Sequence, residues 1–256
     1  MKNMIPGMVI LWIMIGSAFT YGQTETPLTV RVLARDAKWI GTSMGGVEIQ
    51  IRDLSTGTLL VSGITEGSTG DTDVLIHQSK TRYGQLSTEG AASFETSLSL
   101  AEPVFAEVKA IFRTAYTGLP ITVSKDLWLI PGKAMDGDGV VLELPGFAMR
   151  INHPMPHQAV SLANTDEARI DLFMIMLCGC PIEPGGTWDS NPMEVEALVY
   201  REDELIQTIP FDNTETNRFS ADLSNLPVGS YRVFVSAYDP RSKNTGVEKI
   251  QVTIQE

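Results

Sequence analysis

The sequence is poor in the side chains that most often carry enzyme chemistry. It has two cysteines, Cys178 and Cys180, and three histidines, His77, His153 and His157. It contains no His-Glu-x-x-His or Cys-x-x-Cys-His motif and no phosphate-binding glycine loop. Two cysteines are also too few to hold a small disulfide-rich fold together, so the fold must rest on a hydrophobic core. These absences predict a protein that is not an enzyme.

Basic residues are scarce as well. The chain has 19 lysines and arginines against 31 aspartates and glutamates, a formal net charge of −12. Such a field repels nucleic-acid phosphates and anionic lipid headgroups, so neither is an expected partner. Beyond the N-terminus no apolar run is long enough to span a bilayer.

The N-terminus has the composition of an export signal. Lys2 is its only charged side chain, and an apolar run from Met8 to Ile15 is followed by small and polar residues. This run is well short of the roughly 20 residues that a membrane span requires. The pattern predicts a cleaved signal peptide over residues 1–22, with an uncleaved anchor helix as the alternative. We therefore expect an exported protein located in the periplasm, on the cell surface or outside the cell.

Apolar and polar residues alternate with a period of two in most of the remaining chain. This alternation is typical of half-buried antiparallel strands, and turn residues interrupt it at short intervals. No segment has a helical apolar stripe. The sequence thus predicts an all-β fold, with clear strands at 29–35, 47–52, 194–200 and 231–238.

Two halves of the chain repeat the same pattern. Phe94-x-x-x-Leu98 is echoed by Phe219-x-x-x-Leu223 at an offset of 125, and a long alternating strand follows each. The repeat predicts a β-sandwich domain over 23–134 with an inserted surface hairpin at 66–90, a flexible linker at 135–146 and a second β-sandwich over 147–256. The first copy lacks the strand that precedes the matched region of the second. We expect residues 140–144 or the insertion to cover the edge left open.

The end of the second copy resembles a known class of domain. The pattern Leu226-Pro-x-Gly-x-Tyr231-x-Val-x-Val-x-Ala-x-Asp239 is similar to the last two strands of bacterial immunoglobulin-like domains. The Gly45-Gly-Val-x-Ile-x-Ile stretch resembles transthyretin-type surface modules. These resemblances imply two tandem immunoglobulin-like antiparallel β-sandwiches, and such modules generally bind, space or assemble other proteins. Together with the export signal and the lack of a catalytic motif, they predict an exported, non-enzymatic binding or assembly module with a protein partner, and a homo- or hetero-oligomer is compatible with this prediction.

The Cys178-Gly-Cys180 motif closes the most apolar stretch of the mature chain. Three alternatives are open for it: a disulfide, a metal–thiolate site, or a buried or partner-linked thiol pair. A thiol-redox function would use this motif. Met174 and Met176 precede it on the face that matches the buried face of the first copy, so they are expected in the core.

The His153-Pro-Met155-Pro-His157 segment offers a second chemical possibility. Prolines at alternate positions favour an extended backbone, which directs the two histidines and the methionine to roughly the same side. Imidazole and thioether groups suit copper, and the thiols of Cys178 and Cys180 lie in the same half of the chain. A periplasmic copper-binding protein using these five residues is therefore the alternative function. A plain proline-rich connector is the alternative to copper binding for the segment itself.

Overall fold

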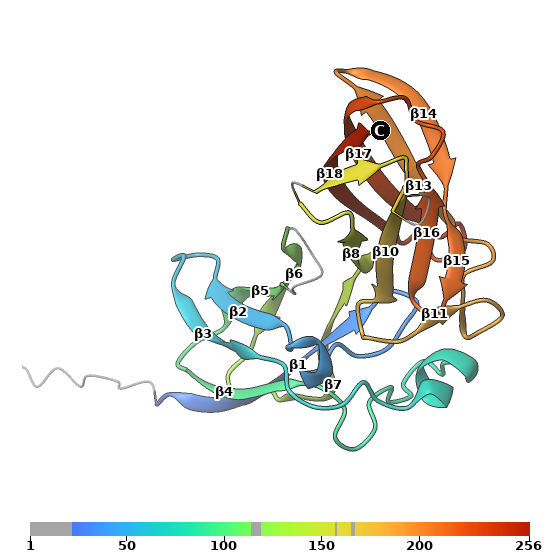
Figure 1. The fold of residues 1–256 in the computed structure, drawn as a ribbon. Helices are drawn as coiled ribbons and strands as arrows, with labels where there is room; N and C mark the ends of the chain where they lie inside the picture. The colour runs from blue at the N-terminus through green and yellow to red at the C-terminus, as the bar shows by residue number, and fades with distance from the viewer. Residues whose placement is uncertain (1–21, 114–118, 157, 165–166) are drawn as a thin grey trace, which may run out of the picture.

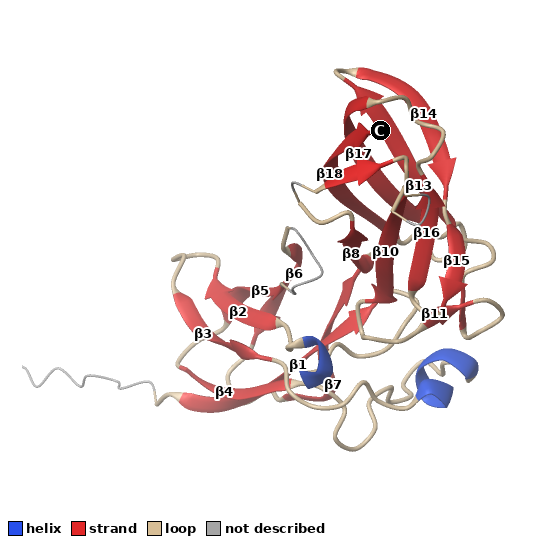
Figure 2. Cartoon of the chain, viewed as in Figure 1, coloured by secondary structure: helices blue, strands red, loops and turns tan. Residues whose placement is uncertain are grey.

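The chain folds into two β-sandwich domains, which confirms the predicted all-β tandem architecture (Figure 1). The structure is a computed structural model, and nearly all of its regular structure is strand (Figure 2). The predicted signal peptide falls almost wholly outside the described residues. In the part of the chain that the structure describes, no helix has the length and apolarity needed to cross a bilayer. The structure describes residues 22–113, 119–156, 158–164 and 167–256.

Domain 1 packs a sheet of order β4-β1-β7 against a sheet of order β3-β2-β5-β6. Both sheets contribute to one buried core, in which Val30, Ile51 and Val108 are inaccessible to solvent. The strands are β1 (Thr24–Ala34), β2 (Glu48–Asp53), β3 (Leu59–Ile64), β4 (Phe94–Leu100), β5 (Val104–Phe112), β6 (Ile121–Leu129) and β7 (Met135–Leu144).

Domain 2 packs a sheet of order β15-β16-β10-β8 against a sheet of order β14-β13-β17-β18-β9. A short parallel pair, β11 with β12, lies in the connection between β10 and β13. The strands are β8 (Phe147–His153), β9 (Ala159–Ser161), β10 (Arg169–Met176), β11 (Ile182–Glu183), β12 (Trp188–Asp189), β13 (Glu194–Arg201), β14 (Glu204–Pro210), β15 (Asp212–Glu215), β16 (Arg218–Asp222), β17 (Gly229–Tyr238) and β18 (Thr245–Gln255).

Alternating burial explains why these segments form strands. In β10 the apolar side chains Ile170, Leu172, Met174 and Met176 are buried, and the residues between them are partly exposed. Each pleated strand therefore presents one face to the core and the other toward solvent. The expected core positions of the two methionines are confirmed, and they fill the sandwich.

The internal repeat extends to the register of strand pairing. In domain 1, Phe105 of β5 lies opposite Trp128 of β6. In domain 2, Ser230 of β17 lies opposite Thr253 of β18, which are the same two positions shifted by 125. Because the shift holds on both strands of the pair, the two domains share one hairpin geometry at this point.

The predicted linker 135–146 is mostly a strand. Residues 135–144 form β7, which pairs in parallel with β1 from Val30↔Val140 to Ala34↔Leu144. β7 occupies the sheet position that β8 has in domain 2, so it supplies the strand missing from the first copy. The expectation that residues 140–144 cover the open edge is confirmed. Only Pro145 and Gly146 separate β7 from β8.

The predicted inserted hairpin at 66–90 is wrong. The segment contains a short π-helix, η2 (Asp73–His77), and touches the domain through isolated bridges. The Asp71 carboxylate accepts hydrogen bonds from two backbone N–H groups at the start of this helix, at 2.8 and 3.1 Å. Leu75 packs with Leu33 and the fully buried Trp39 in a second small core. Burial of Leu75, together with the local hydrogen bonds to the Asp71 carboxylate, favours a helical turn over a hairpin.

Candidate functional site: a strand-edge groove and the domain junction

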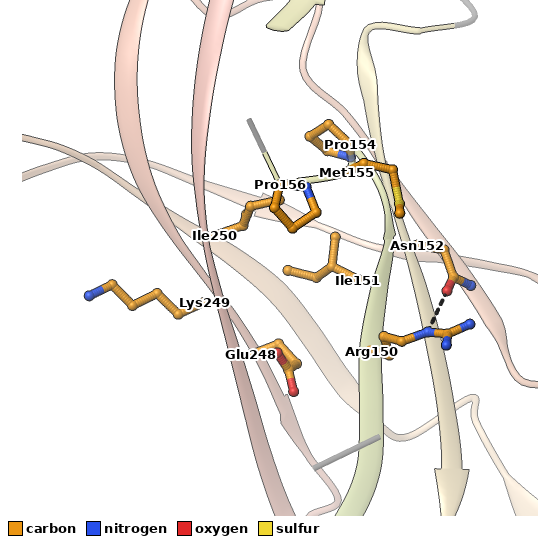
Figure 3. Close-up of a pocket in the computed structure, with 9 residues that line it drawn as sticks. All are labelled: Arg150, Ile151, Asn152, Pro154, Met155, Pro156, Glu248, Lys249 and Ile250. Carbon is orange, nitrogen blue, oxygen red and sulfur yellow. Dashed lines mark hydrogen bonds between the residues drawn. The ribbon is translucent and has the colours of Figure 1, made fainter. Parts of the chain in front are cut away.

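A groove opens along the side of domain 2, between β8 of one sheet and β18 of the other (Figure 3). Its volume is about 510 Å³. Figure 3 shows Ile151 between the two strands, close to Met155 and Pro156 of the connector. The lining residues are Arg150, Ile151, Asn152, Pro154, Met155, Pro156, Glu248, Lys249 and Ile250.

Both strands present an open backbone edge to this groove. β8 pairs with β10 along one side. β18 pairs with β17 over its length but with β9 only at Thr253–Gln255. In the sheet orders of the described residues β8 is an edge strand, and residues 245–252 of β18 pair with β17 alone. Such an edge is a ready template for an added strand.

The side chains around the groove combine an apolar floor with a few polar groups. Ile250 is buried, whereas Met155 is 59% exposed. The Arg150 Nε donates a hydrogen bond to the Asn152 Oδ1 at 2.9 Å. Burial raises the pKa of Glu248, although a hydrogen bond from a backbone N–H opposes this. The groove thus offers apolar contact and backbone hydrogen bonds rather than a nucleophile with a base.

Cys178 and Cys180 are joined by a disulfide, the first of the three alternatives that the sequence left open. Both cysteines are buried, and their loop follows β10 directly. Gly179 has a positive φ of 79°, and a Cβ built on it would lie 3.0 Å from the Met44 Sδ. Since Met44 belongs to a short 3₁₀ turn of domain 1, the disulfide loop contacts the other domain.

Further hydrogen bonds join the two domains around this loop. The Trp188 indole Nε1 donates to the Asp36 carbonyl oxygen at 2.7 Å. Asn244 is fully buried; its Oδ1 accepts from the Gly146 N–H at 2.7 Å, and its Nδ2 donates to the Arg35 carbonyl oxygen at 3.0 Å. Asn244 of domain 2 therefore binds both the connection between the domains, at Gly146, and domain 1, at Arg35.

Charged groups at the junction have opposite pKa shifts. Burial raises the pKa of Asp36, and the nearby Asp239 carboxylate adds to this. Burial also acts to raise the pKa of Asp239, but hydrogen bonds from Ser242 and Arg241 outweigh it, so the pKa lies below its usual value. The Arg241 Nη2 also donates to the Asp189 carbonyl oxygen at 2.8 Å. The contacts of Asp239 and Arg241 order this part of the junction.

The structure does not assemble the five predicted copper ligands. His153 pairs with Asp171 near the start of β10, whereas Cys178 lies seven residues further on, roughly 20 Å away at the rise of a strand. The His153 ring Nε2 is 2.9 Å from the Glu167 carbonyl oxygen, and both cysteines are committed to the disulfide. His157 lies outside the described residues. No group of three histidine, cysteine, aspartate or glutamate side chains that could hold a metal occurs within the described ranges, and copper binding by the histidine segment stays a prediction.

No family model and no curated protein sequence matches the chain. Several solved structures align over most of it, among them the following two. The fibronectin(III)-like modules of Clostridium thermocellum CbhA are 11% identical, with coverage of 90% of this chain and 94% of theirs and a TM-score of 0.27. The titin immunoglobulin tandem A164–A165 is 13% identical, with coverage of 91% and 98% and a TM-score of 0.25. At these TM-scores the alignments carry no argument about function.

Sequence reasoning missed the residues that join the domains. Trp188, Asp36 and Asn244 meet from positions far apart in the chain. Asn244 stands before Thr245-Gly246, where an asparagine is typical of an ordinary turn. No local pattern distinguishes a turn asparagine from one that bridges two domains. The groove was missed for the same reason, because its two walls are about 100 residues apart in the sequence.

Proposed function

We propose that this protein is an exported, non-enzymatic binding or assembly module, and that the groove of domain 2 takes up an extended segment of a partner protein. The single observation that supports this most is the pair of open strand edges, β8 and β18, on either side of an apolar floor. Strand addition uses this arrangement, in which main-chain hydrogen bonds give affinity and pockets for alternate side chains give specificity.

The joined domains also suit a binding module. Hydrogen bonds from Trp188 and Asn244 hold domain 2 against domain 1, so the groove has a fixed orientation relative to the rest of the chain. A partner bound to a preorganised surface loses less conformational freedom on the side of the module.

The test is capture of the native partner by groove variants. Met155→Asp places a carboxylate in the groove wall, and Val228→Asp makes the same change at a similarly exposed site (54%, against 59% for Met155) that does not line the groove. We expect the captured partner, quantified by mass spectrometry after cross-linking in cells, to fall at least tenfold with Met155→Asp. Val228→Asp should capture it as the unchanged protein does. Equal capture by both variants would contradict the groove as the binding site.

Export is tested separately. Cell fractionation and N-terminal sequencing of the native protein should find it outside the cytoplasm, starting near residue 23. Recovery of the intact chain from the cytoplasm would remove export from the proposal without affecting the groove.

Copper binding by His153, Met155 and His157 remains an untested alternative. Titration of Cu(I) against a competing chelator, with the unchanged protein and with His153→Ala/His157→Ala, decides it. The same weak affinity in both proteins would end this alternative.

A further inference from the structure

The outer face of one sheet of domain 1 exposes a compact apolar patch. We define the aromatic face as Leu54, Phe105 and Trp128, whose side chains are 42%, 37% and 58% exposed. The Phe105 and Trp128 rings lie opposite each other on β5 and β6, with centroids 5.1 Å apart and planes inclined at 42°. Leu54 is adjacent, because its N–H donates to the Phe105 carbonyl oxygen. Large exposed apolar patches of this kind mark interaction sites.

Two carboxylates continue the same face. Glu107 and Asp126 are the next outward residues on β5 and β6, and they lie directly opposite each other. Like charges in this position destabilise a sheet. Neither forms an ion pair with a described residue. Arg52 is the register partner of Glu107, but its guanidinium donates to the Gly57 carbonyl oxygen at 2.6 Å instead. The face therefore holds two facing carboxylates beside the two rings without a direct ion pair from a described residue, although the cations Arg52 and Lys109 lie on the same face.

The second domain shows that the fold does not require this combination. At the positions equivalent to Phe105 and Trp128 it has Ser230 and Thr253, whose hydroxyl groups are 3.3 Å apart. At the positions equivalent to the two carboxylates it has a cation and a neutral residue, Arg232 and Gln251. The same strand pair folds with small polar groups, so exposed rings and facing carboxylates are specific to domain 1.

We propose that the aromatic face docks a basic segment of a partner protein through lysine or arginine side chains. Cations are attracted to the faces of Trp and Phe rings, and Trp contributes strongly to interface hot spots. The Glu107 and Asp126 carboxylates would neutralise the charge of the bound side chain, and the net charge of −12 attracts a basic partner from a distance. This inference rests on the proposed function and names the chemistry of a partner, at a surface separate from the groove.

The experiment uses the whole mature protein, labelled with ¹⁵N, and a blocked hexalysine peptide as the probe. We expect the Trp128 indole signal and the amides of 105–109 and 124–128 to shift on titration, less so as salt is raised. A blocked hexaglutamine peptide should produce no such shifts. Phe105→Ser/Trp128→Thr, which installs the residues of domain 2, should weaken hexalysine binding at least tenfold.

A second variant separates binding from folding. Glu107→Gln/Asp126→Asn removes the repulsion between the facing carboxylates, so we expect a higher melting temperature together with at least tenfold weaker hexalysine binding. If the two carboxylates had a purely structural role, their replacement would not raise the melting temperature and weaken hexalysine binding at the same time. The groove variant Met155→Asp should bind hexalysine as the unchanged protein does, so loss of the groove and loss of the aromatic face are distinguishable.

Three results would overturn the proposal. The first is an unmoved Trp128 signal with hexalysine, and the second is equal binding of hexaglutamine. The third is a Trp128 signal that shifts with protein concentration alone, accompanied by a dimer in analytical ultracentrifugation, because the occupant would then be a second copy of this chain.

Discussion

At the residue scale, Gly179 between the two cysteines is a position at the domain contact where a side chain would be strained. Its φ of 79° lies in the left-handed region, and a Cβ would meet the Met44 Sδ at 3.0 Å. Gly185 has a similar φ of 69° with nothing within 4 Å of an added Cβ. We expect Gly185→Ala to lower the free energy of unfolding by about 1 kcal/mol, the backbone cost alone. Gly179→Ala should lower it by about 1 kcal/mol more because of the contact.

Chemical denaturation of the two variants measures this difference. Equal losses would show that the disulfide loop does not press against domain 1.

Asp138 is a second residue with a measurable role. Its carboxylate accepts hydrogen bonds from the backbone N–H groups of Leu86 and Ser87 at 2.7 and 2.8 Å, which ties the insertion to β7. Burial acts to raise the pKa of Asp138, but the hydrogen bonds outweigh it and the pKa lies below its usual value. A lowered folded-state pKa stabilises the protein above the unfolded-state value of about 3.9, and this stabilisation is lost as the pH falls through the folded-state pKa.

Asp138→Asn should therefore lower the free energy of unfolding by about 1–2 kcal/mol at pH 7. The deficit relative to the unchanged protein should shrink below about pH 4. Urea unfolding between pH 7 and pH 3 provides the measurement. A deficit that stays constant over this range would contradict an ionised carboxylate as the hydrogen-bond acceptor.

Single residues were predictable from sequence only where the repeat or the strand pattern constrains them. Met174 was expected in the core because it aligns with Ala34 of the first copy, and Met176 because it lies on the same strand face; both are buried. The state of Cys178 and Cys180 was left open among three alternatives, because spacing alone does not choose between a disulfide and a thiol. The partner of Trp188 lies 152 residues away, beyond any local signal.

At the element scale, β7 is the strand that completes domain 1. It pairs with β1 on the side where the first copy has no strand of its own. A fragment of residues 23–134 would leave β1 unpaired along that edge. It would also expose the part of the core that Val140 and Leu142 cover in the whole domain. We expect the fragment 23–146 to unfold cooperatively and the fragment 23–134 to be unfolded or aggregated, since an open apolar edge is a pairing hazard.

Circular dichroism melting of the two fragments checks this prediction. Equal melting temperatures would show that β7 is dispensable and that the domain ends at 134.

Most elements were predictable because their alternation is local, and the exceptions have a physical cause. In β7 the alternation is interrupted: Leu28 pairs with Met135 but Val30 with Val140, so extra residues of β7 bulge out between these pairs. Gly137 and Gly139 both have positive φ there, and Gly139 lies against the Thr29 carbonyl oxygen with no room for a Cβ. A bulge that is rich in glycine and acidic residues has the composition of a flexible linker. The sequence alone therefore does not distinguish a bulged strand from a linker.

At the scale of the whole molecule, the two domains meet through a connection of two residues and a set of buried and partly buried hydrogen bonds. β7 ends at Leu144 and β8 begins at Phe147, so the edge strand of one domain runs almost directly into the edge strand of the other (Figure 1). The disulfide loop and Trp188 contact domain 1 at the same junction. The groove and the aromatic face therefore keep a fixed separation, which allows one partner to engage both with a gain in effective concentration.

Asn244 is the residue that most directly tests this fixed geometry. It is fully buried, and its side chain bonds both Gly146 of the connection and Arg35 of domain 1. Asn244→Ala leaves the buried Gly146 N–H and the partly buried Arg35 carbonyl group without these partners, so we expect a loss of about 2–3 kcal/mol in the free energy of unfolding. Residual dipolar couplings should then fit two independent alignment tensors, and small-angle scattering should show a broader distribution of distances. Asn225→Ala, at an exposed turn of domain 2, should change neither measurement. If Asn244→Ala keeps a single alignment tensor, the orientation of the domains is set by the disulfide loop and Trp188 rather than by this asparagine.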